Sequence, residues 1–198
     1  MSGIIAWNYF ASCLISTSGT FTINANLFGK VYFPRIIVPL ATVVSGLSRF
    51  CVQLIMFLGF YFYYKYIVNQ DISFSYQSFI LLPFMIVQMA MLGLGIGMII
   101  SSLTTKYRDL SHLVNFGTQL MMYASPIVYP LSVVPDKYKY FILANPMTPV
   151  IEGFRQAFLD VGNLDSNLFI YSLTLTFIIF FLGLLIFNKV EKTFIDTV

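Results

Sequence analysis

The sequence predicts an all-α integral membrane protein that crosses the bilayer about five times. Hydrophobic residues make up 58% of the 198-residue chain and charged residues only 10%, whereas soluble domains contain about 25% charged residues. The mean hydropathy is +0.82. Five apolar runs separated by short polar segments approach or reach the length of a membrane span. They cover residues 4–23, 40–64, 78–103, 113–128 and 168–187.

Basic residues in the short connectors predict how the chain is oriented. Short loops rich in Lys and Arg are retained in the cytoplasm, so we expect the cytoplasmic face to hold Lys30, Arg35, Lys106, Arg108, Lys189 and Lys192. The outer face then holds Lys65, Lys137, Lys139 and Arg155. The C-terminal tail, residues 188–198, is therefore expected inside and the N-terminus outside. The aromatic belt at an interface is expected to include Trp7, Tyr9 and Phe10.

The connector Asn24–Pro39, NANLFGKVYFPRIIVP, is basic and stiff. It contains Lys30 and Arg35 but no acidic residue, and Pro34 and Pro39 would each end or kink a helix. One interpretation is a short amphipathic element that lies at the cytoplasmic membrane surface and is offered to a partner. The other is an ordinary loop between two spans, and the spacing does not separate the two.

Polar residues inside two apolar runs indicate a hydrated interior. Arg49 lies within the second run, where a charge either faces a protein partner or cavity, or snorkels to the head groups. The fourth run is interrupted by Asn115, Thr118, Gln119 and Ser125, residue types that line a bundle interior or a water-filled path.

The glycine patterns favour helix packing over nucleotide binding. Gly93 and Gly97 form a GxxxG pair inside an apolar run, which lets two helix backbones approach closely. Gly29 and Lys30 are followed by Val31 rather than Ser or Thr, so the connector is not a phosphate-binding P-loop. We therefore expect no ATP hydrolysis by this chain, and neither its His nor its two Cys suggest a metal site.

Residues 131–167 are predicted to form two short helices separated at Asn145-Pro146. The first would cover Asp136–Leu143, and the second would begin with Thr148 as N-cap and Pro149 at the first helical position. Both are too short to span, so they lie in the outer interface or form a re-entrant pair. The apolar stripe of the second would be Ile151, Phe154, Phe158 and Leu159, and its polar face Glu152, Arg155 and Gln156.

Four stretches of the chain resemble the permease subunits of type-2 ABC exporters. The closest similarity is to the bacterial permeases that export O-antigen, teichoic acid and capsular polysaccharide. The stretches are Ile5–Ala11, Asn24–Leu40, the loop Tyr107–Leu110 with Ser125–Pro130, and Asn145–Leu159. Their order and spacing match, so the resemblance covers essentially the whole chain. Family members begin with an interfacial helix and one further span, which this chain is expected to lack.

The resemblance implies roles for particular segments. Residues 24–39 would be the coupling helix that docks on a separate ATPase subunit, through Lys30, Tyr32, Phe33, Pro34 and Arg35. Residues 131–167 would form outer gate helices. The conduit or gate would include Arg49, Gln119, Tyr123, Tyr129, Phe154 and Arg155.

The implied function is transport of a lipid-linked polysaccharide or polyol-phosphate polymer across the bacterial cytoplasmic membrane. The chain would bind no cofactor, metal or nucleic acid itself, and ATP and Mg²⁺ would be bound by the ATPase partner. One chain has too few polar helix faces to enclose a hydrated conduit, so we expect a homodimer.

Two alternatives remain open at this point. A drug or small-lipid efflux permease of the same superfamily would need a compact, closed pocket. A membrane enzyme acting on polyprenyl-linked sugars would need paired acids or metal-binding carboxylates near a membrane face. The cytoplasmic side offers only Asp109, Glu191 and Asp196, with no paired-acid motif.

Overall fold

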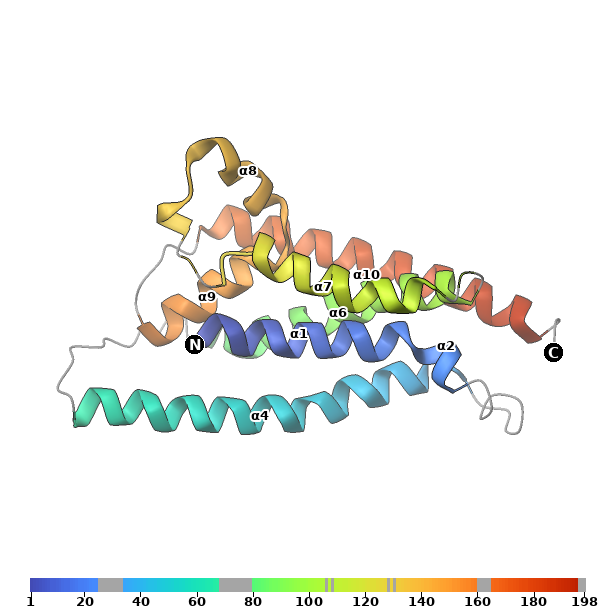
Figure 1. Ribbon diagram of the computed structural model, residues 1–198, viewed down its shortest axis with the longest axis horizontal. Helices are drawn as coiled ribbons and strands as arrows, with labels where there is room; N and C mark the ends of the chain where they lie inside the picture. Colours follow the sequence, from blue (N-terminus) through green and yellow to red (C-terminus); the bar gives the residue numbers. More distant parts are fainter. Residues whose placement is uncertain are drawn as a thin grey trace.

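The computed structural model describes residues 1–24, 34–67, 80–105, 107, 109–127, 129, 131–159 and 165–195. Their helices are α1 (Ser2–Ser18), α2 (Thr20–Ile23), α4 (Ile37–Tyr66), α6 (Leu82–Thr104), α7 (Leu110–Ala124), α8 (Asp136–Ala144), α9 (Met147–Leu159) and α10 (Ser166–Ile195), with a 3-10 turn at Leu131–Val133. The long helices run side by side in an elongated bundle (Figure 1). The N-terminus, α8 and α9 lie at one end, and α2 and the C-terminus lie at the other. The predicted all-α membrane fold is confirmed.

Three of the described helices are long and apolar enough to cross a membrane: α4, α6 and the Ser166–Glu191 part of α10. The other two predicted spans are shorter. α1 has 17 residues and α7 has 15, which correspond to about 25 Å and about 22 Å of helix, below the hydrocarbon thickness of about 30 Å. α1 continues into α2 after a break at Gly19, and α7 ends just before Pro126. α10 extends through Ile195, so much of the expected tail is helical.

α6 packs tightly against α1 through the glycines that the sequence singled out. A Cβ atom at Gly93 would lie 2.7 Å from the Cβ of Cys13, and one at Gly97 would lie 2.6 Å from the Cβ of Thr17. Real Cβ atoms do not approach other atoms this closely, so these positions require glycine. The predicted packing role of the GxxxG pair is confirmed.

The opposite side of α6 meets α10 through a second pair of glycines. A Cβ at Gly95 would lie 2.8 Å from the Cα of Phe180, and one at Gly183 would lie 2.5 Å from the carbonyl oxygen of Gly95. Both contacts are with backbone atoms, which cannot rotate away as a side chain can. α6 is therefore the central helix, held between α1 and α10 by glycines on two faces.

A buried chain of hydrogen bonds joins α6 and the N-terminal part of α10 to the turn between α8 and α9. The Gln88 amide nitrogen donates to the Ser172 hydroxyl at 2.7 Å. The Ser172 hydroxyl in turn donates to the carbonyl oxygen of Pro146 at 2.5 Å. These bonds connect the two short helices to the bundle, because Pro146 lies directly between them.

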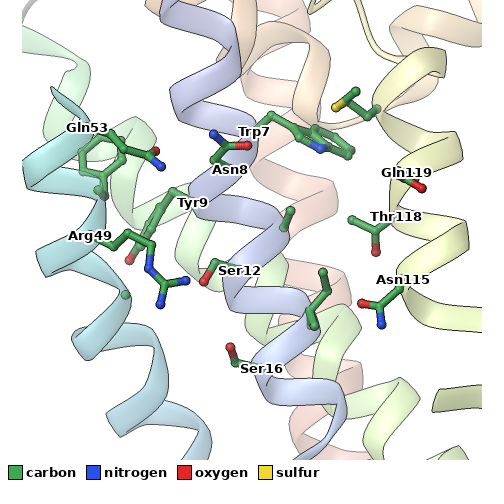
Figure 2. A pocket seen from close by; sticks show the side chains of 15 residues that line it. Trp7, Asn8, Tyr9, Ser12, Ser16, Arg49, Gln53, Asn115, Thr118 and Gln119 are labelled. Atoms are coloured by element: carbon green, nitrogen blue, oxygen red, sulfur yellow. The ribbon is translucent and has the colours of Figure 1, made fainter. Parts of the chain in front are cut away.

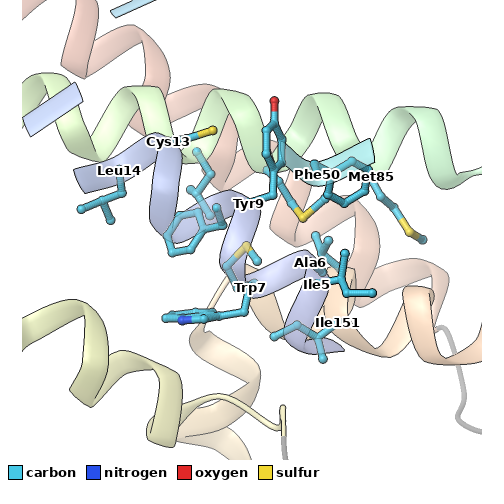
Figure 3. Close-up of a cluster of buried hydrophobic side chains, with 14 of the residues drawn as sticks. Ile5, Ala6, Trp7, Tyr9, Cys13, Leu14, Phe50, Met85 and Ile151 are labelled. Carbon is cyan, nitrogen blue, oxygen red and sulfur yellow. The ribbon is translucent and has the colours of Figure 1, made fainter. Parts of the chain in front are cut away.

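The aromatic rings at the start of α1 lie in the core. Trp7, Tyr9 and Phe10 are all buried, and they belong to the cluster of side chains shown in Figure 3. Tyr9 packs on Phe50 of α4 with ring centroids 5.1 Å apart. The prediction of an interfacial belt for these rings is therefore wrong, because neighbouring helices cover all three side chains.

The two short helices form around Asn145-Pro146 as predicted, but the cap differs. The Asn145 side-chain oxygen accepts a hydrogen bond from the Met147 backbone N–H at 3.0 Å, so α9 begins at Met147. The Thr148 hydroxyl donates to the Ile142 carbonyl oxygen at 2.5 Å instead of capping the helix. The prediction of Thr148 as N-cap is wrong, because Asn145 supplies the acceptor first.

Candidate functional site

A polar groove of about 560 Å³ runs between α1, α4 and α7. Figure 2 shows α1 between the two other helices, with its side chains Asn8, Ser12 and Ser16 facing the groove. These residues are four positions apart, so they lie in one row along the helix. The opposite face of α1 packs on the glycines of α6. α1 therefore carries one close-packed face and one small, polar face.

The two walls of the groove add longer polar side chains. α4 contributes Arg49 and Gln53, and α7 contributes Asn115, Thr118 and Gln119. In Figure 2 the Arg49 guanidinium points away from α4 toward α1. None of the described residues that line the groove is acidic. The groove therefore combines hydrogen-bonding side chains and one positive charge with apolar side chains such as Ile15 and Met122.

Of the predicted conduit residues, Arg49 and Gln119 line this groove together. Tyr123 lies at the end of α7 with 68% of its surface exposed. Tyr129 follows in the turn beyond α7, and its hydroxyl donates to the carbonyl oxygen of Tyr123 at 3.3 Å. These two tyrosines are close to each other but are not among the residues that line the groove.

Phe154 and Arg155 of α9 lie elsewhere. Phe154 is 1% exposed and packs edge-on against Phe50, with centroids 6.4 Å apart. Arg155 forms a salt bridge of 2.6 Å with Glu152 and donates to the carbonyl oxygen of Pro126 at 3.0 Å. Burial raises the pKa of the Glu152 carboxyl, and the Arg155 guanidinium opposes that rise. The expected polar face of α9 is thus an internal ion pair that ties α9 to the end of α7.

Within the connector Asn24–Pro39, the structure describes Asn24 and residues 34–39. Lys30, Tyr32 and Phe33 lie outside the described residues. Pro34 is exposed, but Arg35 is 7% exposed and its backbone N–H donates to the Glu191 carboxylate at 3.2 Å. Arg35 is therefore enclosed next to α10 in the isolated chain, and Pro34 is the described residue of this set that reaches the surface.

The side chains of the groove are suited to hydrogen bonding with a ligand. Within residues 1–24, 34–67 and the later described segments, no three His, Cys, Asp or Glu side chains gather closely enough to hold a metal ion. The groove offers amides, hydroxyls and one guanidinium, which can form hydrogen bonds with hydroxyl or phosphate oxygens of a ligand.

Comparison with known proteins decides the family. The profile of the ABC-2 type transporter family matches residues 1–159. The chain belongs to this family. An ABC-2 type transporter chain is a transport subunit rather than an enzyme, and its long apolar helices make it a multi-pass membrane protein.

Individual relatives of this ABC-2 chain are named after polysaccharides. This chain is 30% identical to the O-antigen export system permease protein RfbA of Klebsiella pneumoniae over 197 aligned residues. The alignment covers 99% of this chain and 73% of RfbA. The chain is also 22% identical to the polysialic acid transport protein KpsM of Escherichia coli over 199 aligned residues. That alignment covers 100% of this chain and 74% of KpsM.

The sequence did not reveal the α1 side of the groove in this ABC-2 chain. No sequence pattern singled out Asn8, Ser12, Ser16 or Gln53 as a site residue. The available signal was the four-residue spacing of the three small polar residues, together with the same spacing of Arg49 and Gln53. That spacing indicates a polar row, but it does not show which helices face it.

Proposed function

We propose that this chain is the permease subunit of an ABC exporter that moves a lipid-linked polysaccharide or polyol-phosphate polymer across the bacterial cytoplasmic membrane. A separate ATPase subunit, which binds ATP and Mg²⁺, supplies the energy. The names of the relatives support the polymer class, since both an O-antigen permease and a polysialic acid transporter align over nearly the whole chain.

The observation that carries the proposal is the polar groove. Asn8, Ser16, Arg49, Asn115 and Gln119 all line it and are all exposed. Polar and charged side chains are costly in hydrocarbon, so such a row faces a cavity or a partner rather than lipid. Hydroxyl-rich sugars are suited to a surface of amides and hydroxyls, because each group can exchange a hydrogen bond with water for one with the polymer.

The open side of the groove supports a homodimer. A single chain lines the groove with three helices and leaves five of its polar residues exposed. A second copy turned toward the first would close the two grooves into one hydrated conduit. An open groove also favours a polymer over a drug or small lipid, because a small ligand gains most from a compact pocket that buries most of its surface.

The function is tested in proteoliposomes that hold this chain and its ATPase subunit. A lipid-linked polysaccharide is supplied on the ATPase side, and its arrival on the other side is measured with an impermeant lectin or glycosidase. ATP-dependent transfer is expected. Transfer of drugs or short-chain lipids without transfer of the polymer would favour the efflux permease instead.

The homodimer predicts cross-links between residues on the open side of the groove. A Gln119→Cys variant, made with Cys51→Ser because Cys51 is the exposed native thiol, is expected to form a covalent dimer with a short bifunctional thiol reagent in membranes. Ile55→Cys is the matched control, since Ile55 is exposed on another part of α4 outside the groove. Equal cross-linking at both positions would mean that the contacts are random collisions.

The connector is predicted to bind the ATPase subunit through its aromatic residues. Truncating Phe33 to Ala should weaken the association about thirtyfold, because losing an interface hot spot typically costs about 2 kcal/mol. Lys30→Ala should have a smaller, salt-dependent effect, as is usual for charges at an interface rim. The measurement is co-purification of the ATPase subunit from detergent. Full retention of that subunit by a Tyr32→Ala, Phe33→Ala double variant would show that residues 24–39 are an ordinary loop.

A further inference from the structure

A second, apolar pocket of about 620 Å³ lies between α4, α6 and α9. It is lined by Leu54 and Leu58 of α4, by Leu82 and Ile86 of α6, and by Phe158 of α9. Its volume falls within the range of sites that bind small molecules, about 300–1,000 Å³. The chain thus contains a ligand-sized apolar space that is separate from the polar groove.

One end of this apolar pocket carries a positive charge. Lys65 lines the pocket in the last turn of α4, and its ammonium lies 5.8 Å from the centroid of the Tyr61 ring. Among the described residues that line the pocket, Lys65 is the one with a charged side chain. A ligand that complements this surface has a long apolar body and an anionic end.

The pocket has the length of one membrane leaflet. From Phe50 at the deep end to Lys65 at the other, α4 rises by about 22 Å, and one leaflet including its head groups is about 20–22 Å thick. Exposed aromatic residues Tyr63, Tyr64 and Tyr66 flank Lys65. Tyrosines are enriched at the level of the head groups, so the position of Lys65 matches the depth of a lipid phosphate.

We propose that this pocket binds one anionic phospholipid from the leaflet on the side of α8 and α9. An acyl chain lies along Leu54, Leu58 and Ile86, and the lipid phosphate pairs with the Lys65 ammonium. The lipid fills the space between α4 and α6 and thereby holds α4 against the bundle.

Two features favour a bilayer lipid over the exported polymer as the occupant. The buried Phe50 ring lines both spaces and separates the apolar pocket from the polar groove. The described lining of the pocket also contains no side-chain amide for a sugar chain to use, because its polar groups are the Lys65 ammonium and the Tyr61 hydroxyl. The proposal therefore does not depend on the identity of the transported substrate.

Another part of α4 provides a matched control. Ile55, Met56, Gly59 and Phe60 line a different apolar hollow, together with Tyr63 and Tyr64, and none of these residues is charged. Lipids that touch this hollow are ordinary boundary lipids. They should show no preference for an anionic head group.

The experiment uses tryptophan fluorescence in bilayers that contain brominated lipids. The chain has one tryptophan, Trp7, whose signal is measured in the unmodified protein and subtracted. A Leu58→Trp variant reports on the pocket, an Ile86→Trp variant reports on its facing wall, and an Ile55→Trp variant reports on the uncharged hollow. Quenching by dibrominated phosphatidylglycerol is compared with quenching by dibrominated phosphatidylcholine at equal mole fraction.

At Leu58→Trp and Ile86→Trp, phosphatidylglycerol is expected to bind about fivefold more tightly than phosphatidylcholine, the preference that one basic residue near a membrane surface supplies. Lys65→Gln should abolish this preference, and Lys137→Gln on α8 should leave it intact. Ile55→Trp should show equal binding of both lipids. Equal quenching by the two lipids at the pocket reporters, or a preference that survives Lys65→Gln, would overturn the proposal.

Discussion

Replacing Gly183 by Ala is expected to destabilise the protein by about 3 kcal/mol, at the upper end of the range for overpacked interiors. The new Cβ would lie 2.5 Å from the carbonyl oxygen of Gly95. That oxygen belongs to the α6 backbone, so the strain is relieved only if α6 and α10 move apart. Gly95→Ala should behave in the same way, because its Cβ would meet the Phe180 backbone at 2.8 Å.

Gly59 and Gly117 provide controls with the opposite sign. A Cβ at either position meets no atom within 4 Å, and both glycines lie inside helices. Alanine there should stabilise the helix by up to about 1 kcal/mol, since glycine is a poor helix former. The measurement is thermal unfolding of the purified protein in detergent, followed by circular dichroism. Equal midpoints for Gly183→Ala and Gly117→Ala would show that α6 and α10 do not approach as closely as described.

Replacing Arg49 by Leu is expected to reduce polymer export by up to about a hundredfold while leaving membrane insertion intact or improved. A hydrogen bond that involves a charged group contributes about 1.5–3 kcal/mol, and Arg49 supplies the charge of the groove. The same substitution removes a residue that costs about 2.5–3.5 kcal/mol to insert near the middle of a helix. The two effects have opposite signs, so they separate transport from folding.

The comparison needs two further variants. Arg49→Lys keeps the charge but loses the planar, forked donor set, so it should retain part of the transport. Val52→Leu serves as the neutral control, because Val52 is exposed elsewhere on α4 and does not line the groove. Export is scored by surface polysaccharide and insertion by the amount of protein in purified membranes. Wild-type export by Arg49→Leu would mean that Arg49 merely snorkels to the head groups.

The sequence alone determined the class of the molecule and much of its helix order. Runs of apolar residues predict long helices regardless of their neighbours, because a helix in lipid must satisfy its own backbone. Asn145 and Pro146 separate α8 from α9, and Pro126 follows the end of α7. Gly93 and Gly97 could also be read directly, since glycine four residues apart in an apolar helix has few uses other than close packing.

Only the tertiary structure shows which helix faces pack against one another and which face lipid. In a membrane protein, lipid and core are equally apolar, so a buried face and a lipid face look alike in sequence. That is why Trp7, Tyr9 and Phe10 were expected at the interface although they lie in the core. The same ambiguity hid the Gly95–Gly183 contact, which joins residues on two different helices.

Charged and polar residues show the same division between sequence and structure. Arg49 and Arg155 were both expected in the conduit or gate. Arg155 has Glu152 three positions before it and the Pro126 carbonyl beside it, so it is held in an internal ion pair. Arg49 meets the row of Asn8, Ser12 and Ser16 only because α4 packs beside α1. Whether a basic residue forms an internal ion pair or lines a groove therefore depends on the residues that the fold places next to it.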